Sequence, residues 1–244
     1  MQENLQWRIT AFFDYWRKRH AFISNLDLSE YHHEANVLLW AAFDALSSIW
    51  AENIGKEQCQ TTKKRIIFDA FLARYGGEVF QIVSLPDVWN RADDEIKKKQ
   101  TTFNKNTYTF LSEIGGRRNP PKITDEYRLR HSSDDLSMDA ILLKKYPQTD
   151  SDKLKKWLNP SRYGSIAYKE MRSAFIHEGR YGSNAHGDEL AESAKKPTYL
   201  SGIYTTPPIM GFALEFMLPV LKSCIDAFEA EALKVQKDPA PYNR

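Results

Sequence analysis

An arginine and a histidine near the end of one predicted helix are the residues of this chain best suited to chemistry. Arg172 and His177 lie five positions apart, shortly before Gly179. Histidine exchanges protons near neutral pH, and arginine stabilises negative charge on phosphate oxygens. Such a pair is competent to cleave RNA without a metal, with His177 as general acid or base and Arg172 stabilising the phosphate charge in the transition state.

The spacing of the pair leaves its geometry open. Residues five apart lie about 140° around an α-helix, so Arg172 and His177 do not share one ridge. They can still reach a common point beyond the helix end, or converge with their symmetry mates across a two-fold axis. The alternative is an ordinary surface network, in which Arg172 pairs with a glutamate and His177 with a carbonyl group.

An acidic residue inside the most apolar predicted helix is a third candidate. That helix is expected from Ser29, a predicted N-cap, to Glu52, and hydrophobic residues surround it on most sides. Asp44 lies in the middle of this run. A buried carboxylate is costly unless it is paired, so Asp44 should have a basic partner from elsewhere in the chain.

These residues together resemble a known superfamily. The segment Arg-Ser-Ala-Phe-Ile-His-Glu-Gly over 172–179 resembles the Arg-x4–6-His motif of the HEPN superfamily. The helix over 38–46 is similar to the earlier core helix of that superfamily, with its acidic residue among aromatics, and the last predicted helix is similar to its closing helix. The resemblance covers about residues 29–90 and 160–236, and it implies a helical bundle that dimerises and joins two Arg/His pairs in one cleft.

The resemblance also implies an activity. It implies a metal-independent endoribonuclease in a toxin–antitoxin or phage-defence setting, which leaves 2′,3′-cyclic phosphate ends. Arg172 and His177 would be catalytic, with Asp44 as a supporting acid. The implied partners are RNA, a second copy of the chain and an antitoxin or other defence-system protein. Because HEPN-like proteins without nuclease activity exist, the alternative is a non-catalytic nucleotide- or protein-binding module.

Residues around the motif are candidates for substrate contacts. These are Ser173, Glu178, Arg180 and Tyr181. Two of them depart from the resemblance. Ser173 stands where family members often carry Asn, Asp or His, and Tyr181 follows His177 by four residues, whereas some members carry a His-x-Tyr sequence. In the loop that follows, His186 is expected in solvent.

Cofactor and metal motifs are missing from the sequence. His32, His33 and Glu34 are consecutive, so on a helix they point about 100° apart and chelate one ion poorly. Two cysteines, Cys59 and Cys224, are too few for a disulfide framework or a four-cysteine zinc site. No phosphate-binding loop or dinucleotide fingerprint occurs. We therefore expect neither metal nor cofactor.

The composition is that of a folded protein without a global basic excess. Of 244 residues, 42% are hydrophobic and 27% charged, and 34 Lys+Arg against 32 Asp+Glu give a net charge of +2. This excludes an extended, salt-driven polynucleotide binder but allows a local basic cleft. No apolar stretch approaches the roughly 20 residues of a membrane span, and the first residues lack the pattern of a signal peptide. A cytoplasmic location without a membrane partner is expected.

Hydrophobic periodicity predicts an all-α protein, a helical bundle with a charged helical insert and at most one small β-hairpin. The resemblance implies that this bundle is HEPN-like. Residues 1–90 are assigned to the N-terminal helices of a single domain, 91–159 to an insert of short helices and loops, and 160–236 to the motif helix and the C-terminal helix. The hairpin is expected to pair 198–200 with 203–204.

Capping signals give the expected ends of several helices. Thr61 or Thr62 should cap the third helix, Ser161 should start the motif helix and Gly179 should end it. The last helix is expected to open at Pro207-Pro208 and to carry Met210.

Overall fold

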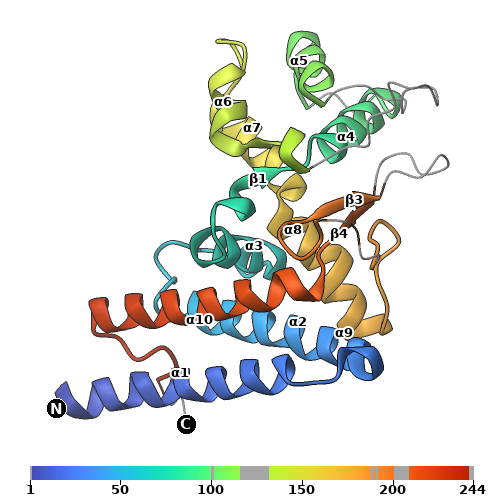
Figure 1. The fold of residues 1–244 in the computed structure, drawn as a ribbon. Coiled ribbons are helices and arrows are strands. Elements are labelled where there is room, and N and C mark those ends of the chain that lie inside the picture. The colour runs from blue at the N-terminus through green and yellow to red at the C-terminus, as the bar shows by residue number, and fades with distance from the viewer. Residues whose placement is uncertain are drawn as a thin grey trace.

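The computed structural model describes residues 2–99, 102–115, 132–187, 190, 192–200 and 209–241. In this part of the chain nearly all regular structure is helical, and two small two-stranded antiparallel sheets complete it (Figure 1), which confirms the predicted all-α class. The α-helices are α1 (Gln2–Ser24), α2 (Leu28–Glu52), α3 (Lys64–Tyr75), α4 (Leu85–Lys97), α5 (Lys105–Gly115), α6 (Met138–Lys144), α7 (Ser151–Leu158), α8 (Tyr163–Ile166), α9 (Ala174–Glu178) and α10 (Leu214–Val235). The strands are β1 (Ile82–Val83), β2 (Leu136–Ser137), β3 (Thr198–Leu200) and β4 (Ile209–Gly211).

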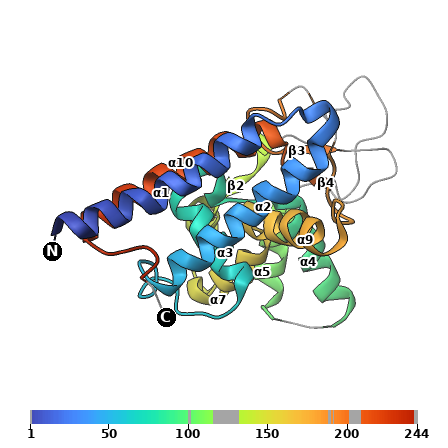
Figure 2. The same ribbon diagram turned by 90° about the horizontal axis from the view of Figure 1, so that it is seen from below.

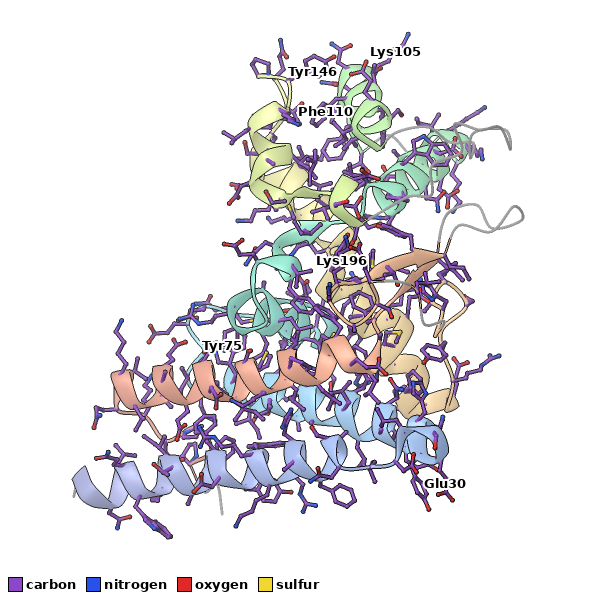
Figure 3. The ribbon with its side chains drawn as sticks, viewed as in Figure 1. Glu30, Tyr75, Lys105, Phe110, Tyr146 and Lys196 are labelled. Atoms are coloured by element: carbon purple, nitrogen blue, oxygen red, sulfur yellow. The ribbon has the colours of Figure 1, made fainter. Side chains whose placement is uncertain are left out.

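The main hydrophobic core lies between α1, α2, α3, α10 and the motif helix. Helix α2 is central, with Trp40, Phe43 and Leu46 completely buried, as expected of a helix that is apolar on most sides. Helices α1 and α10 lie side by side along one face of the bundle (Figure 2). Aromatic packing joins α10 to α3, where Tyr75, labelled in Figure 3, stacks on Phe228 with ring centroids 5.6 Å apart.

Helices α4 to α7 enclose a second hydrophobic cluster, which lies above the bundle in Figure 1. Its buried side chains include Leu111, Ile141 and Leu154. Phe110 and Tyr146, labelled in Figure 3, make an edge-to-face contact at 6.0 Å between α5 and the segment after α6. The region between the two halves of the main bundle is therefore packed around its own core. Strands β1 and β2, which the sequence pattern does not indicate, pair at its base.

The predicted N-cap residues of α2 and α3 are wrong. The cap of α2 is Asp27, not Ser29, because the Asp27 carboxylate accepts a hydrogen bond from the Ser29 amide at 3.0 Å and starts the helix earlier. Helix α3 begins at Lys64 without a side-chain cap, so neither Thr61 nor Thr62 has the predicted role. The hydroxyl of Thr61 instead accepts a hydrogen bond from the Lys63 amide, one residue before the helix.

The segment before α10 is a strand rather than the predicted helix start. Met210 lies in β4, which pairs antiparallel with β3 in the register Tyr199 to Met210, and α10 begins only at Leu214. Extended backbone is favoured there because β3 supplies a hydrogen-bonding partner on one side. Residues 203–204, the predicted partner of β3, and Pro207-Pro208 lie outside the described residues. None of the helices described is long and apolar enough to cross a membrane.

Candidate active site

The motif helix changes its winding just before the predicted catalytic residues. It begins as α8 at Tyr163, becomes a π-helix, η4, over Ala167–Ser173 and returns to α-helix as α9. The predicted start at Ser161 is two residues early, since Ser161 ends a short 3₁₀ turn. A π turn holds more residues than an α turn and is frequent at functional sites. Here it brings both Glu170 and Arg172 into the interior on either side of Met171.

Asp44, Arg172 and His177 lie together at the junction of α2 with the motif helix. Arg172 Nη2 donates a hydrogen bond to Asp44 Oδ2 at 2.6 Å, so Asp44 has the basic partner that its place in an apolar helix predicts. Arg172 Nη1 lies 3.5 Å from His177 Nε2, at the outer limit of a hydrogen bond. Helical side chains lean toward the N-terminus of their helix, which lets His177 reach back toward Arg172 despite their five-residue spacing.

The three side chains differ in exposure. Arg172 is 6% exposed, Asp44 is partly exposed and His177 lies at the surface. The arrangement is thus a surface imidazole able to accept a proton, backed by a fixed positive charge that a carboxylate holds in place.

Arg172 is further held by an aromatic ring. Its guanidinium carbon lies 5.2 Å from the centroid of Tyr168, one turn earlier, and Tyr168 in turn meets Phe68 of α3 edge to face at 5.4 Å. Arg172 Nε is buried and has no hydrogen-bond partner among the described residues. One face of the guanidinium is thus covered by Tyr168 and its tip is bound to Asp44. The positive charge is fixed in position before any substrate arrives.

The helix that carries His177 ends where the sequence predicts. Gly179 takes the left-handed conformation with φ of 64°, and its amide bonds to the carbonyl oxygen of Phe175. Another imidazole lies beside this end: the His33 ring is 5.8 Å from that of Phe175. Sequence reasoning considered His33 only as a metal ligand. His33 precedes Asp44 by 11 residues, which is about three helical turns. This spacing alone predicts that the two side chains lie on the same face of α2.

The loop after the motif is fastened to the motif helix by Glu170. Glu170 accepts hydrogen bonds from the backbone and side-chain nitrogens of Asn184, at 3.1 and 3.2 Å, and its backbone carbonyl accepts one from Gly182 at 2.7 Å. Although burial opposes it, hydrogen bonds from Lys169 and Asn184 hold the pKa of Glu170 below its ordinary value. A buried charge with several partners of this kind fixes a loop, and sequence reasoning did not identify Glu170.

The remaining predicted contact residues take different positions. Tyr181 is half-buried and meets Phe175 edge to face at 4.8 Å, and Ser173 is half-buried on η4 beside Arg172. Glu178 and Arg180 pair with each other in solvent at 2.8 Å, so their charges are directed at each other rather than at the Asp44–Arg172 pair.

The loop position of His186 predicts a solvent-exposed side chain, and this prediction is wrong. His186 is 6% exposed, and its Nε2 lies 3.2 Å from the carbonyl oxygen of Thr198. His186 therefore connects the loop after the motif to β3. Because it is buried, it does not belong to the exposed surface on which His177 lies.

No group of three or more His, Cys, Asp or Glu side chains is placed to hold a metal ion in the part of the chain that the structure describes. Comparison of the chain with family models, with curated proteins and with solved structures gives no match. The geometry of Asp44, Arg172 and His177, together with the sequence resemblance, is what bears on function.

Proposed function

We propose that the chain is a metal-independent endoribonuclease of HEPN type. The observation that carries the proposal is the convergence of Asp44, Arg172 and His177, from two helices far apart in the sequence, at a surface-exposed imidazole. Arg172 stabilises negative charge on the scissile phosphate, His177 is general acid or base, and Asp44 keeps the guanidinium in place. Ser173 and Tyr181 flank the site as substrate contacts, with Glu178 and Arg180 further out in solvent.

The proposed reaction is an internal transfer of the phosphodiester. The 2′-hydroxyl of one nucleotide attacks its own 3′-phosphorus, and the bond from phosphorus to the next 5′-oxygen breaks. One His177 accepts the proton of the 2′-hydroxyl, and the leaving 5′-oxygen takes a proton from His177 of a second copy. The products are a 2′,3′-cyclic phosphate and a 5′-hydroxyl. This division of roles is why the proposal includes a homodimer that joins two Arg172/His177 pairs.

The sequence resemblance alone supports the biological setting. We infer a cytoplasmic toxin or phage-defence nuclease, whose activity is restrained or triggered by an antitoxin or another defence-system protein.

One observation favours the second candidate function, a non-catalytic nucleotide- or protein-binding module. Arg172 is 6% exposed and already bound to Asp44, so its charge is partly satisfied before a phosphate arrives. In that case the Asp44–Arg172 pair would be a structural link between α2 and the motif helix. Nucleotide binding without RNA turnover would identify this function.

Cleavage of a labelled RNA in excess EDTA distinguishes the two candidates. We expect the wild-type protein to cleave, and Arg172→Ala and His177→Ala to lose cleavage by about 100-fold or more, the usual contribution of such groups. His20→Ala is the matched control, since this imidazole lies on α1 against the carbonyl of Leu218. Retained cleavage in His177→Ala, or a strict need for Mg²⁺, refutes the nuclease proposal.

A further inference from the structure

A basic groove adjoins the Arg172 side of the motif helix. It has a volume of ≈ 420 Å³ and lies between the start of α3 and the π-helical segment η4. Its walls carry Lys63, Lys64, Arg65, Tyr168, Lys169 and Ser173. Four of these side chains are cationic. The sequence pattern does not predict the groove, because its two walls are about 100 residues apart in the chain.

Lys63, Lys64 and Arg65 lie at the N-terminus of α3, where the helix dipole disfavours positive charge. Lys63 occupies the N-cap position of α3, followed by Lys64 and Arg65, and the first turn contains no acidic residue. The N-terminus of a helix carries partial positive charge, so cations there are unfavourable without an anion nearby. In the described part of the chain no carboxylate forms an ion pair with Lys63 or Lys64, which are both exposed. A bound anion would relieve this repulsion.

The other wall of the groove is continuous with the proposed catalytic residues. Tyr168 is half-buried, and the Arg172 guanidinium lies against its ring. Ser173 follows Arg172 directly in the chain. Lys169 is already paired with Glu170 at 2.6 Å and Arg65 is half-buried, so the exposed Lys63 and Lys64 are the cations most open to a ligand. An anion bound in the groove would lie beside Tyr168, whose ring the Arg172 guanidinium contacts.

We propose that this groove holds the strand of single-stranded RNA next to the scissile bond, an inference that rests on the proposed function. Lys63 and Lys64 bind phosphates that neighbour the cleaved one, and the exposed surface of Tyr168 packs against a base. Basic side chains alternating with an aromatic ring are the usual means of holding single strands without reading their sequence. A duplex keeps its bases stacked inside and gives Tyr168 no partner.

The groove itself does not need the 2′-hydroxyl. Its contacts are to phosphate oxygens and to the face of a base, which RNA shares with its 2′-modified analogues. Only the cleavage step requires a free 2′-hydroxyl as nucleophile. A fully 2′-O-methylated oligonucleotide is therefore a ligand that binds in the groove and is not cut, which separates binding from catalysis.

Fluorescence anisotropy with a labelled 2′-O-methyl 12-mer tests the proposal. Each phosphate contact to a single strand adds about 0.7 to the slope of log affinity against log salt. Lys63→Gln/Lys64→Gln should therefore bind about 25-fold more weakly at 0.1 M salt, with the slope reduced by about 1.4. Lys155→Gln/Lys156→Gln is the matched control: it removes the same charge from exposed positions on α7, in the second cluster, and should bind like wild type.

The aromatic part of the proposal has its own variants. Tyr168→Leu should bind at least about fivefold more weakly, because it loses base stacking, whereas Tyr168→Phe should bind like wild type because it keeps the ring. Circular dichroism spectra that match those of the wild-type protein establish that each variant is folded. If Tyr168→Leu and Tyr168→Phe bind equally, no base packs on this ring.

The outcomes separate this inference from the proposed function. Equal affinity of the Lys63/Lys64 and Lys155/Lys156 double variants, or no binding by wild type, overturns the groove even if the protein cleaves RNA. Groove-dependent binding by a wild-type protein that cleaves no RNA supports the groove as a nucleic-acid site and overturns the nuclease. The single-strand assignment is also overturned if the wild-type protein binds a duplex more tightly than the single strand and the Lys63/Lys64 double variant loses affinity for both to the same extent.

Discussion

The pairing of Asp44 with Arg172 predicts a specific pattern of stability changes. The Arg172 side chain is 8% exposed and that of Asp44 19%. Breaking a fully buried pair by removing one partner costs about 3–5 kcal/mol, because the remaining charge stays uncompensated. Asp44→Asn removes the charge but keeps an oxygen acceptor, and the site is partly open to water. We therefore expect a loss of about 2–3 kcal/mol in the free energy of unfolding.

The complementary change should cost less. Arg172→Met leaves Asp44, the more exposed partner, which water can solvate, so a loss of about 1–2 kcal/mol is expected. The double variant Asp44→Asn/Arg172→Met should be no less stable than Asp44→Asn alone, because no uncompensated charge remains. This corresponds to a coupling energy of at least about 1–2 kcal/mol, within the range measured for residues in contact.

Urea denaturation of the wild type and the three variants measures this cycle. Thermal unfolding gives an independent reading, since the Asp44→Asn change should lower Tm by about 5–10 °C in a chain of this size. Additive losses, with the double variant less stable than the wild type by the sum of the two single losses, would show that the two side chains do not interact. That result would remove the structural basis of the proposed site.

Three further predictions follow from individual contacts. Burial, partly offset by the charge of Arg162, raises the pKa of Asp69 to about 6 from 3.8. Between these two pKa values, folding therefore takes up a proton. As pH rises from about 4 to 7, denaturation curves should show that the wild type loses about 3 kcal/mol of unfolding free energy relative to Asp69→Asn. A difference between the two proteins that does not change with pH would contradict this. Gly179 has φ of 64°, so Gly179→Ala should cost about 1 kcal/mol and Gly179→Asn less, measured by thermal unfolding; equal losses would refute the strain. Glu170→Gln should speed amide exchange at Asn184 by about tenfold or more, because its backbone hydrogen-bond acceptor loses its charge, and unchanged exchange would show that another contact fixes the loop.

The helical class and most helix positions follow from the sequence because periodic apolar residues mark them directly. The stop at Gly179 is a local feature of a single residue. The need of Asp44 for a partner was also readable, since a carboxylate in an apolar helix is costly alone. That the partner is Arg172, 128 positions away, is a tertiary contact that spacing in one helix does not reveal.

The features that sequence reasoning missed depend on long-range packing. The π-helical turn shares its three- and four-residue apolar spacing with an α-helix, so periodicity could not detect it. The pairing of β3 with β4 depends on a backbone partner rather than on residue type, which is why Met210 was assigned to a helix. Glu170 was missed because the residues that it binds, Asn184 and Gly182, lie in the loop after the motif helix.

The most direct test of the central claim uses an oligonucleotide with one ribose among 2′-O-methyl nucleotides, incubated in EDTA and analysed by mass spectrometry. We predict cleavage only after that ribose, giving a 2′,3′-cyclic phosphate and a 5′-hydroxyl, and no cleavage by His177→Ala. Cleavage of the fully 2′-O-methylated strand, or products with a 3′-hydroxyl and a 5′-phosphate, would contradict it.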